Sequence, residues 1–147
     1  MFLNPGQVFA GDHRHRVHTL LGSCVSVTLW APARRVGAMS HYLLADGPQV
    51  AGRAPDPRYG GDALELMCAA LAARGVDPRG CEAKVFGGAD MGAGDGAVGR
   101  RNGELALRRL RAAGIGVRAT SLYGRGHRRI VFDIATGDVW SREGAVA

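Results

Sequence analysis

The clearest pattern in the chain is an alternation of apolar and polar positions in two neighbouring stretches, residues 25–29 and 36–39. A period of two is typical of half-buried β-strands, because successive side chains point to opposite faces of a sheet. Residues 31–35 between them contain Pro32 and indicate a turn, so the two stretches predict a β-hairpin. Shorter runs of the same kind predict six further strands, at 7–10, 17–21, 82–86, 115–122, 128–134 and 139–142.

A helical period replaces the strand period at about residues 62–74. Asp62 and Glu65 have the spacing of a capping box at its start, and Gly75 is suited to end the helix. The stripe expected to face the core is formed by Leu64, Met67, Cys68 and Leu71. This spacing predicts an amphipathic helix with one buried face.

A second helix is predicted from Gly99 or Asn102 to Ala113, closed by Gly114. The residues expected to face inward are Leu107, Leu110 and Ala113, whereas its arginines are expected to form a solvated outer face. The predicted order is strands, helix, strand, helix, strands. With few crossovers suited to parallel pairing, this order predicts an α+β fold in which two helices pack on one side of largely antiparallel strands.

The chain has 147 residues, of which 46% are hydrophobic, which is enough for one domain with its own core and too few for two. We therefore predict a single domain over residues 1–147. No apolar run is long enough to cross a membrane, and the first residues lack the pattern of a signal peptide. Three cysteines without paired spacing indicate reduced thiols. We expect a protein of the cytoplasm with no membrane insertion.

The formal net charge of +6 comes almost wholly from arginine, since Lys84 is the only lysine. This charge favours an acidic macromolecular partner. Aromatic residues are not interleaved with the arginines, so we do not expect nucleic-acid binding.

The predicted hairpin brings a possible catalytic pair together. If its turn is centred between Pro32 and Ala33, residues whose numbers sum to 65 lie opposite each other, and Cys24 and His41 meet that condition. Directly opposed residues of an antiparallel pair share one face, and their Cβ atoms are about 4.5–5.5 Å apart. A slip of one residue would separate the two side chains onto opposite faces.

Gly22 has no side chain to cover the main chain just before Cys24. Backbone N–H groups of residues 22–24 are therefore candidates for an oxyanion site. The glycine-rich run 87–96 lacks the ending of a phosphate-binding loop, and we interpret it as a loop that lets backbone approach substrate or a neighbouring strand. The closely spaced His13, His15 and His18 lack a further ligand, so no metal and no cofactor are expected.

A cysteine beside an imidazole can act as a nucleophile in acyl transfer, because the imidazole takes or holds the thiol proton. The pair alone fits proteases, transglutaminases, deamidases and amidases equally. It also fits a buried cysteine beside a hydrogen-bonded histidine with no catalytic role.

Two motifs narrow this choice: residues 19–27, TLLGSCVSV, and residues 37–44, GAMSHYLL. Together with KVFGG at 84–88, GRRN at 99–102 and Thr-Gly at 136–137, they resemble the CheD family of chemoreceptor glutamine deamidases. The resemblance runs over nearly the whole chain, and it implies a layered α/β/β sandwich.

The resemblance implies that the protein converts glutamine side chains of methyl-accepting chemotaxis receptors to glutamate and releases ammonia through a thioester. Cys24 matches the nucleophile of the family and His41 its general base. Thr19 is the best match for a threonine that orients the histidine, with His18 in the neighbouring position. We expect five residues to lie near the substrate or its oxyanion: Gly22, Ser23, Ser40, Gly87 and Gly88.

Some relatives also bind a CheC-type phosphatase, which makes such a phosphatase a possible partner. The alternative hypothesis is a catalytically idle module that docks on receptors or on a phosphatase. Two loop positions depart from the family pattern: Ala45 stands where proline is usual, and Gly124-Arg125-Gly126 replaces a second Gly-Gly. Both departures concern the fit of the substrate more than the chemistry.

Overall fold

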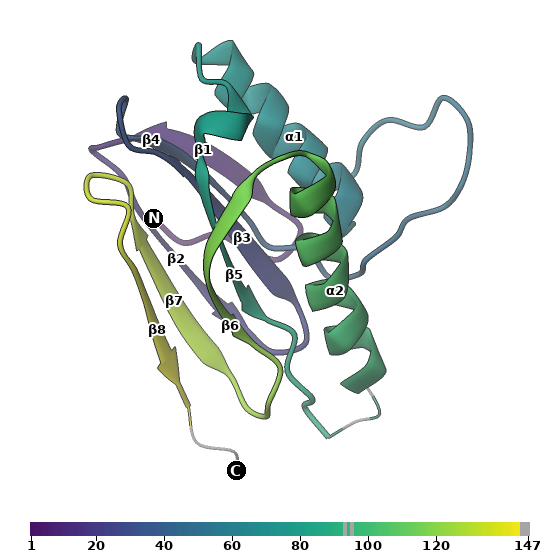
Figure 1. Cartoon of the computed structure of the whole chain (residues 1–147). Coiled ribbons are helices and arrows are strands. Elements are labelled where there is room, and N and C mark those ends of the chain that lie inside the picture. Colours follow the sequence, from purple (N-terminus) through teal and green to yellow (C-terminus); the bar gives the residue numbers. More distant parts are fainter. Residues whose placement is uncertain (93, 95, 145–147) are drawn as a thin grey trace.

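The computed structural model describes residues 1–92, 94 and 96–144, and in this part of the chain it contains eight β-strands, two α-helices and a short 3-10 helix at Pro78–Gly80 (Figure 1). The strands are β1 (Val8–Asp12), β2 (Arg16–Leu21), β3 (Val25–Ala31), β4 (Val36–Ser40), β5 (Glu82–Gly87), β6 (Gly116–Leu122), β7 (Arg128–Asp133) and β8 (Val139–Glu143). The helices are α1 (Gly60–Ala73) and α2 (Gly96–Ala112). The predicted strands and helices are therefore confirmed. Ala93 and Asp95 of the glycine-rich run, and residues 145–147 of the predicted domain, lie outside the described residues.

The strands form two sheets. The larger has the order β1-β4-β3-β5-β6, in which β5 and β6 are parallel and all other neighbours antiparallel. The smaller has the order β2-β7-β8 and is antiparallel throughout. The largely antiparallel arrangement agrees with the predicted α+β class.

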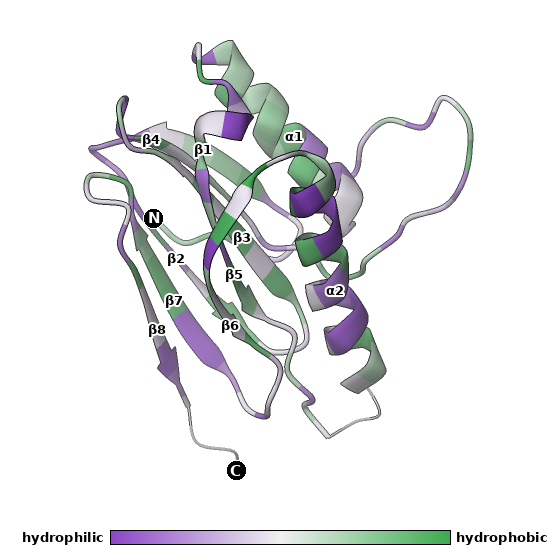
Figure 2. Ribbon diagram, in the orientation of Figure 1, coloured by the Kyte–Doolittle hydropathy of each residue, from purple (hydrophilic) through white to green (hydrophobic). Residues whose placement is uncertain are grey.

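The two helices lie on one face of the five-stranded sheet, and the three-stranded sheet lies on the other (Figure 1). Figure 2 shows hydrophilic residues along much of α2 and hydrophobic residues on β3 and β5. Among the described residues, no helix is long and apolar enough to cross a membrane. The layers are helices, sheet and sheet, as expected for an α/β/β sandwich.

One hydrophobic core lies on each face of the larger sheet. The core beneath the helices includes Val27, Leu29, Met67, Leu105 and Leu110. The core between the two sheets includes Leu21, Met39, Phe86, Ile130 and Phe132. The larger sheet is thus covered on both sides.

This covering makes one prediction wrong: β3 and β4 are not half-buried. Every residue of β4 is buried, as is every residue of β3 except Trp30, which is partly exposed. The polar residues Ser26 and Thr28 indicated a solvent face, but that face meets the second sheet. Alternation within one strand does not reveal that a distant strand covers its polar side.

The register predicted for the hairpin is also wrong. Thr28 pairs with Met39 and Leu29 with Ala38, so the numbers of paired residues sum to 67. The turn spans residues 32–35 and ends with Arg35 in the left-handed conformation (φ 48°), which moves its centre by one residue. A shift of the sum by two exchanges the opposite partners but leaves every side chain on its original face.

The first helix begins earlier than predicted, and it has no capping box. Its N-cap is Tyr59, which makes no side-chain cap. The Asp62 carboxylate instead accepts hydrogen bonds from Asp56 N (2.9 Å) and Arg53 Nη1 (2.6 Å). Asp62 therefore holds the preceding loop against the helix rather than capping it.

The second helix begins at Gly96, three residues before Gly99, and Ala113 is exposed instead of inward. Its core face is formed by Leu105, Ala106 and Leu110, with Leu107 partly buried. Glycine is a poor helix former, so the helical period is weak over this first turn.

Candidate active site

Cys24 is the residue immediately before β3, in a loop that begins at Gly22. Val25 and Val27 belong to the core beneath the helices, whereas Cys24 and Trp30 pack against the core between the sheets. The thiol side chain therefore lies on the face turned toward the second sheet. It is only partly buried, so it is accessible at the edge of that layer.

His41 immediately follows β4 and is buried, with 2% of its surface exposed. Pairing between the strands resumes beyond it at Val25 and Tyr42, which exchange hydrogen bonds of 3.2 and 3.0 Å. Tyr42 belongs to the core beneath the helices, so alternation turns His41 toward the second sheet. In this register Cys24 lies diagonally across from His41, on the same face of the sheet.

Thr19 lies on β2 in the other sheet, and its Oγ1 is 2.7 Å from Nδ1 of His41. The same hydroxyl oxygen is 2.8 Å from the carbonyl oxygen of Leu3. A carbonyl only accepts and a hydroxyl has one proton, so Thr19 donates to Leu3 and accepts from the Nδ1–H of His41. The neutral imidazole therefore carries its proton on Nδ1 and has an unprotonated Nε2.

The N-terminal segment holds the Leu3 carbonyl beside Thr19. Leu3 N donates to His18 O (2.7 Å), and His18 N donates to Met1 O (2.9 Å), so this segment runs along β2. Successive side chains of a strand point to opposite faces, so His18 faces away from His41. Of the two residues considered for the third position, the structure brings Thr19 to His41.

Burial keeps the cysteine and the histidine uncharged. It raises the pKa of the Cys24 thiol and lowers the pKa of His41 from 6.5 to about 4. Near neutral pH the resting site therefore contains a thiol and a neutral imidazole. This differs from a preformed thiolate, and it requires the proton to leave sulfur as the bond to substrate forms.

The main chain of the loop before β3 is tied down through its carbonyl groups. The three hydrogen bonds join Gly22 O to Ala89 N (3.0 Å), Ser23 O to Asn102 Nδ2 (3.0 Å) and Cys24 O to Gly88 N (2.9 Å). Among the described residues, the N–H groups of Gly22 and Ser23 donate to no acceptor. They are therefore free to bind an incoming oxygen.

Gly87 and Gly88 lie directly against this loop. Gly87 has a φ of 106°, and a Cβ there would overlap the carbonyl oxygen of Cys24. Gly88 has a φ of 67°, and a Cβ there would collide with the carbonyl oxygen of Gly99 on α2. The glycines thus let this loop approach the main chain just before β3 and that of α2. The predicted nearness of Gly87 and Gly88 to substrate stays a prediction.

Ser40 is the last residue of β4, and its predicted nearness to substrate stays a prediction. It is fully buried, and its Oγ accepts a hydrogen bond from Val27 N (3.1 Å) in place of a main-chain carbonyl. This contact joins β3 to β4 and leaves Ser40 shielded from solvent.

Across the described residues, no three histidine, cysteine, aspartate or glutamate side chains are grouped so that they could hold a metal ion.

One residue at the site was not among the predicted site residues. Asn102 on α2 is buried, with 1% of its surface exposed, and its Nδ2 donates to Ser23 O (3.0 Å) and Leu43 O (2.9 Å). A polar residue on the inward face of an amphipathic helix is the signal that could have identified it.

The fold and these contacts define a single-domain α+β protein in which a threonine binds a histidine between the two sheets, with a cysteine on the same face of the larger sheet as the histidine. The family described as "CheD chemotactic sensory transduction" matches residues 43–143. That match begins after His41, so the three side chains precede it.

Curated relatives match almost the whole chain. A probable chemoreceptor glutamine deamidase CheD of Albidiferax ferrireducens is 50% identical over 97% of this chain and 86% of its own. Those of Dechloromonas aromatica and Chromobacterium violaceum are 42% and 36% identical, over 95% and 97% of this chain and 85% and 77% of their own. The chain belongs to the CheD family.

Proposed function

We propose that this protein is a hydrolase that deamidates selected glutamine side chains of chemotaxis receptors, with Cys24 as nucleophile and His41 as general base. The observation that carries the proposal is the hydrogen bond between Thr19 and His41, which leaves Nε2 of the imidazole unprotonated on the face it shares with Cys24. The names of the curated relatives support the choice of glutamine as substrate.

The reaction begins when Nε2 of His41 takes the thiol proton as Cys24 Sγ attacks the carboxamide carbon. The N–H groups of Gly22 and Ser23 bind the oxyanion. His41 then gives its proton to the departing nitrogen, the C–N bond breaks, and ammonia leaves a thioester on Cys24. Nε2 next deprotonates water, which attacks the thioester, and glutamate and free thiol result. No step of this scheme calls for a metal or cofactor.

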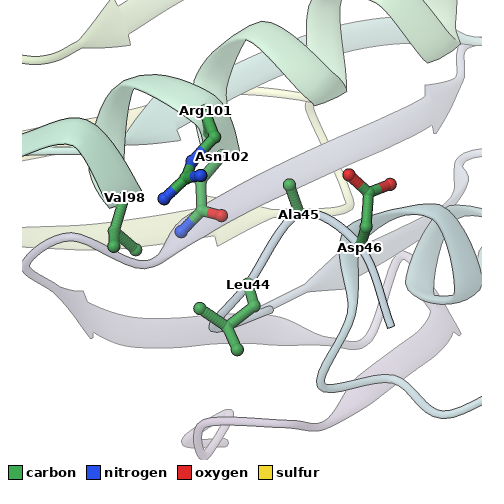
Figure 3. Close-up of a pocket in the computed structure, with 6 residues that line it drawn as sticks. All are labelled: Leu44, Ala45, Asp46, Val98, Arg101 and Asn102. Carbon is green, nitrogen blue, oxygen red and sulfur yellow. The ribbon is translucent and has the colours of Figure 1, made fainter. Parts of the chain in front are cut away.

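The surroundings of the site suit an acidic helical substrate. Leu43 and Leu44, two and three residues after His41, are exposed (36% and 47%), and Arg101 is exposed nearby on α2. Figure 3 shows Leu44, Arg101 and the carboxylate of Asp46 around one pocket, with Asn102 behind them. Apolar and cationic groups together would bind the glutamate-rich surface of a receptor helix. Such a substrate, together with three free cysteines, supports a cytoplasmic location.

Mass spectrometry of receptor cytoplasmic fragments tests the proposal. Incubation with the protein should raise the mass by about one dalton for each converted glutamine and release one ammonia for each. Cys24→Ala should abolish both signals while it retains the fold. Receptor binding without a mass change would instead favour the idle module, and a Cys24→Ala variant with full activity would exclude Cys24 as nucleophile.

A further inference from the structure

Asn102 connects the two segments that carry the candidate catalytic pair. Its Nδ2 donates one hydrogen bond to the carbonyl oxygen of Ser23, the residue before Cys24 (N–O distance 3.0 Å). It donates a second to the carbonyl oxygen of Leu43, two residues after His41 (2.9 Å). Because both acceptors are carbonyls, the amide can only present its NH₂ group to them, which fixes its orientation.

A second contact fixes the helix to the same region. The hydroxyl of Tyr42, beside His41, donates to the main-chain oxygen of Asn102 (2.5 Å), and Tyr42 is buried. In Figure 3 Asn102 projects from α2 toward the loop that carries Leu44 and Ala45. Asn102 therefore receives one hydrogen bond from the histidine segment and donates one to each segment.

The Asn102 side chain lowers the stability of the fold at this position. Asparagine is a poor residue for a helix interior. The Oδ1 atom of Asn102 is buried and has no hydrogen-bond partner among the described residues. An unpaired buried acceptor lowers stability, and alanine or leucine would avoid it. Two donated hydrogen bonds to the site offset that cost, and such local penalties gather at functional sites.

The two segments that carry the pair contact each other at few points at this end of the sheet. The ladder between β3 and β4 is regular from Thr28–Met39 to Ala31–Val36, and beyond it the described contacts between them are the hydrogen bond from Val27 N to Ser40 Oγ and the bridge between Val25 and Tyr42. The other main-chain contacts of the pair go elsewhere, from His41 to residues 6 and 7 and from Cys24 to Gly88. Cys24 and His41 lie outside the regular ladder. Asn102 adds a cross-link from outside the sheet, between Ser23 and Leu43.

We propose that Asn102 is a positioning residue, which sets the distance between the Cys24 thiol and the His41 imidazole by joining the main chain on either side of them. This proposal rests on the proposed function for the roles of the two residues. Truncation of Asn102 lets the segments separate, and a misplacement of about 1 Å can lower a rate about a hundredfold.

The test compares Asn102→Ala and Asn102→Leu with wild type in receptor deamidation. Both variants should lower kcat about 10- to 100-fold with little change in KM, because the lost contacts do not touch the substrate. Asn102→Leu keeps the branched shape of the side chain, and it replaces Asn102→Ala in the test if that variant fails to fold. Leu110→Val, in the same helix and core, is the control: it should lower the melting temperature and leave kcat unchanged.

A second readout does not depend on deamidation. The pH dependence of Cys24 alkylation by iodoacetamide, followed on its own peptide by mass spectrometry, reports how the imidazole affects the thiol. The profiles of both Asn102 variants should shift toward that of His41→Gln, whereas Leu110→Val should match wild type. Asn102 variants with wild-type kcat and wild-type alkylation profiles would overturn the proposal. In another outcome, the pH profile of Cys24 alkylation in wild type depends on His41 but the receptors are not deamidated. That result would overturn the proposed function and leave the positioning role of Asn102 standing.

Discussion

Thr19 and His41 come from different sheets, and their side chains are joined by a 2.7 Å hydrogen bond in which the histidine donates from Nδ1. The direction of this bond follows from the Leu3 carbonyl, which takes the only proton of the threonine hydroxyl. A main-chain oxygen near the N-terminus thereby determines which imidazole nitrogen is free to act as a base.

Thr19→Val should lower kcat about a hundredfold, because valine is close in shape but cannot accept the Nδ1 proton. The imidazole would then be free to adopt the other tautomer and rotate. Thr19→Ser keeps the hydroxyl, and it should retain most of the activity. Steady-state deamidation assays measure both, and equal losses in the two variants would contradict the role given to the hydroxyl.

The acid limb of kcat/KM should lie well below the ordinary histidine range. Burial lowers the pKa of His41 from 6.5 to about 4, and the base must be neutral to act. We expect kcat/KM to remain level down to about pH 5 and to fall as pH approaches 4. Circular dichroism at each pH separates this fall from unfolding. A limb near pH 6.5 would show that the histidine titrates normally.

Stability should depend on pH through the same residue. Between pH 6.5 and about 4 the unfolded chain protonates this histidine and the folded protein does not, so stability falls as pH decreases through this window. The full effect is roughly 3 kcal/mol. His18 also has a lowered pKa, mainly from burial, so the comparison is with His41→Gln. Urea unfolding of the variant should show a weaker dependence on pH than wild type, and identical slopes would refute this.

Gly87→Ala should disturb the cysteine loop. A Cβ there overlaps the carbonyl oxygen of Cys24 and also forces a side chain into a φ of 106°. We expect a loss of roughly 3 kcal/mol or more, with a fall in activity. Gly114→Ala is the control, because φ there is 72° and an added Cβ would meet no atom within 4 Å apart from its chain neighbours. This variant measures the cost of the backbone conformation alone, and it should lower the free energy of unfolding by about 1 kcal/mol. Equal losses in urea unfolding would exclude the close approach as the cause.

The sequence predicts the elements well because their signals are local. The strand predicted at 17–21 is present, and its residues Val17, Thr19 and Leu21, which share one face, are buried. The partner of Thr19 depends on how the second sheet packs, which no local pattern contains. The hairpin register failed for a related reason, since the conformation of Arg35 sets the length of the turn.

The parts of the site that depend on contacts between distant segments could not be read from the sequence. Asn102 and Ser23 are 79 residues apart, and only the docking of α2 brings them together. Cys24 and His41 could be identified from the sequence because each adjoins the end of a predicted strand. They lie on one face as predicted, because the sum of paired residue numbers differs from the prediction by two, which leaves side chains on their original faces.

Trapping with hydroxylamine tests the central claim, a thioester on Cys24, most directly. If the acyl group passes through sulfur, hydroxylamine competes with water for it, and wild type should leave a hydroxamate at the glutamines that otherwise become glutamate. Peptide mass spectrometry detects this product, and Cys24→Ala should form neither hydroxamate nor glutamate. Glutamate without hydroxamate at every hydroxylamine concentration, or conversion by Cys24→Ala, would contradict the mechanism.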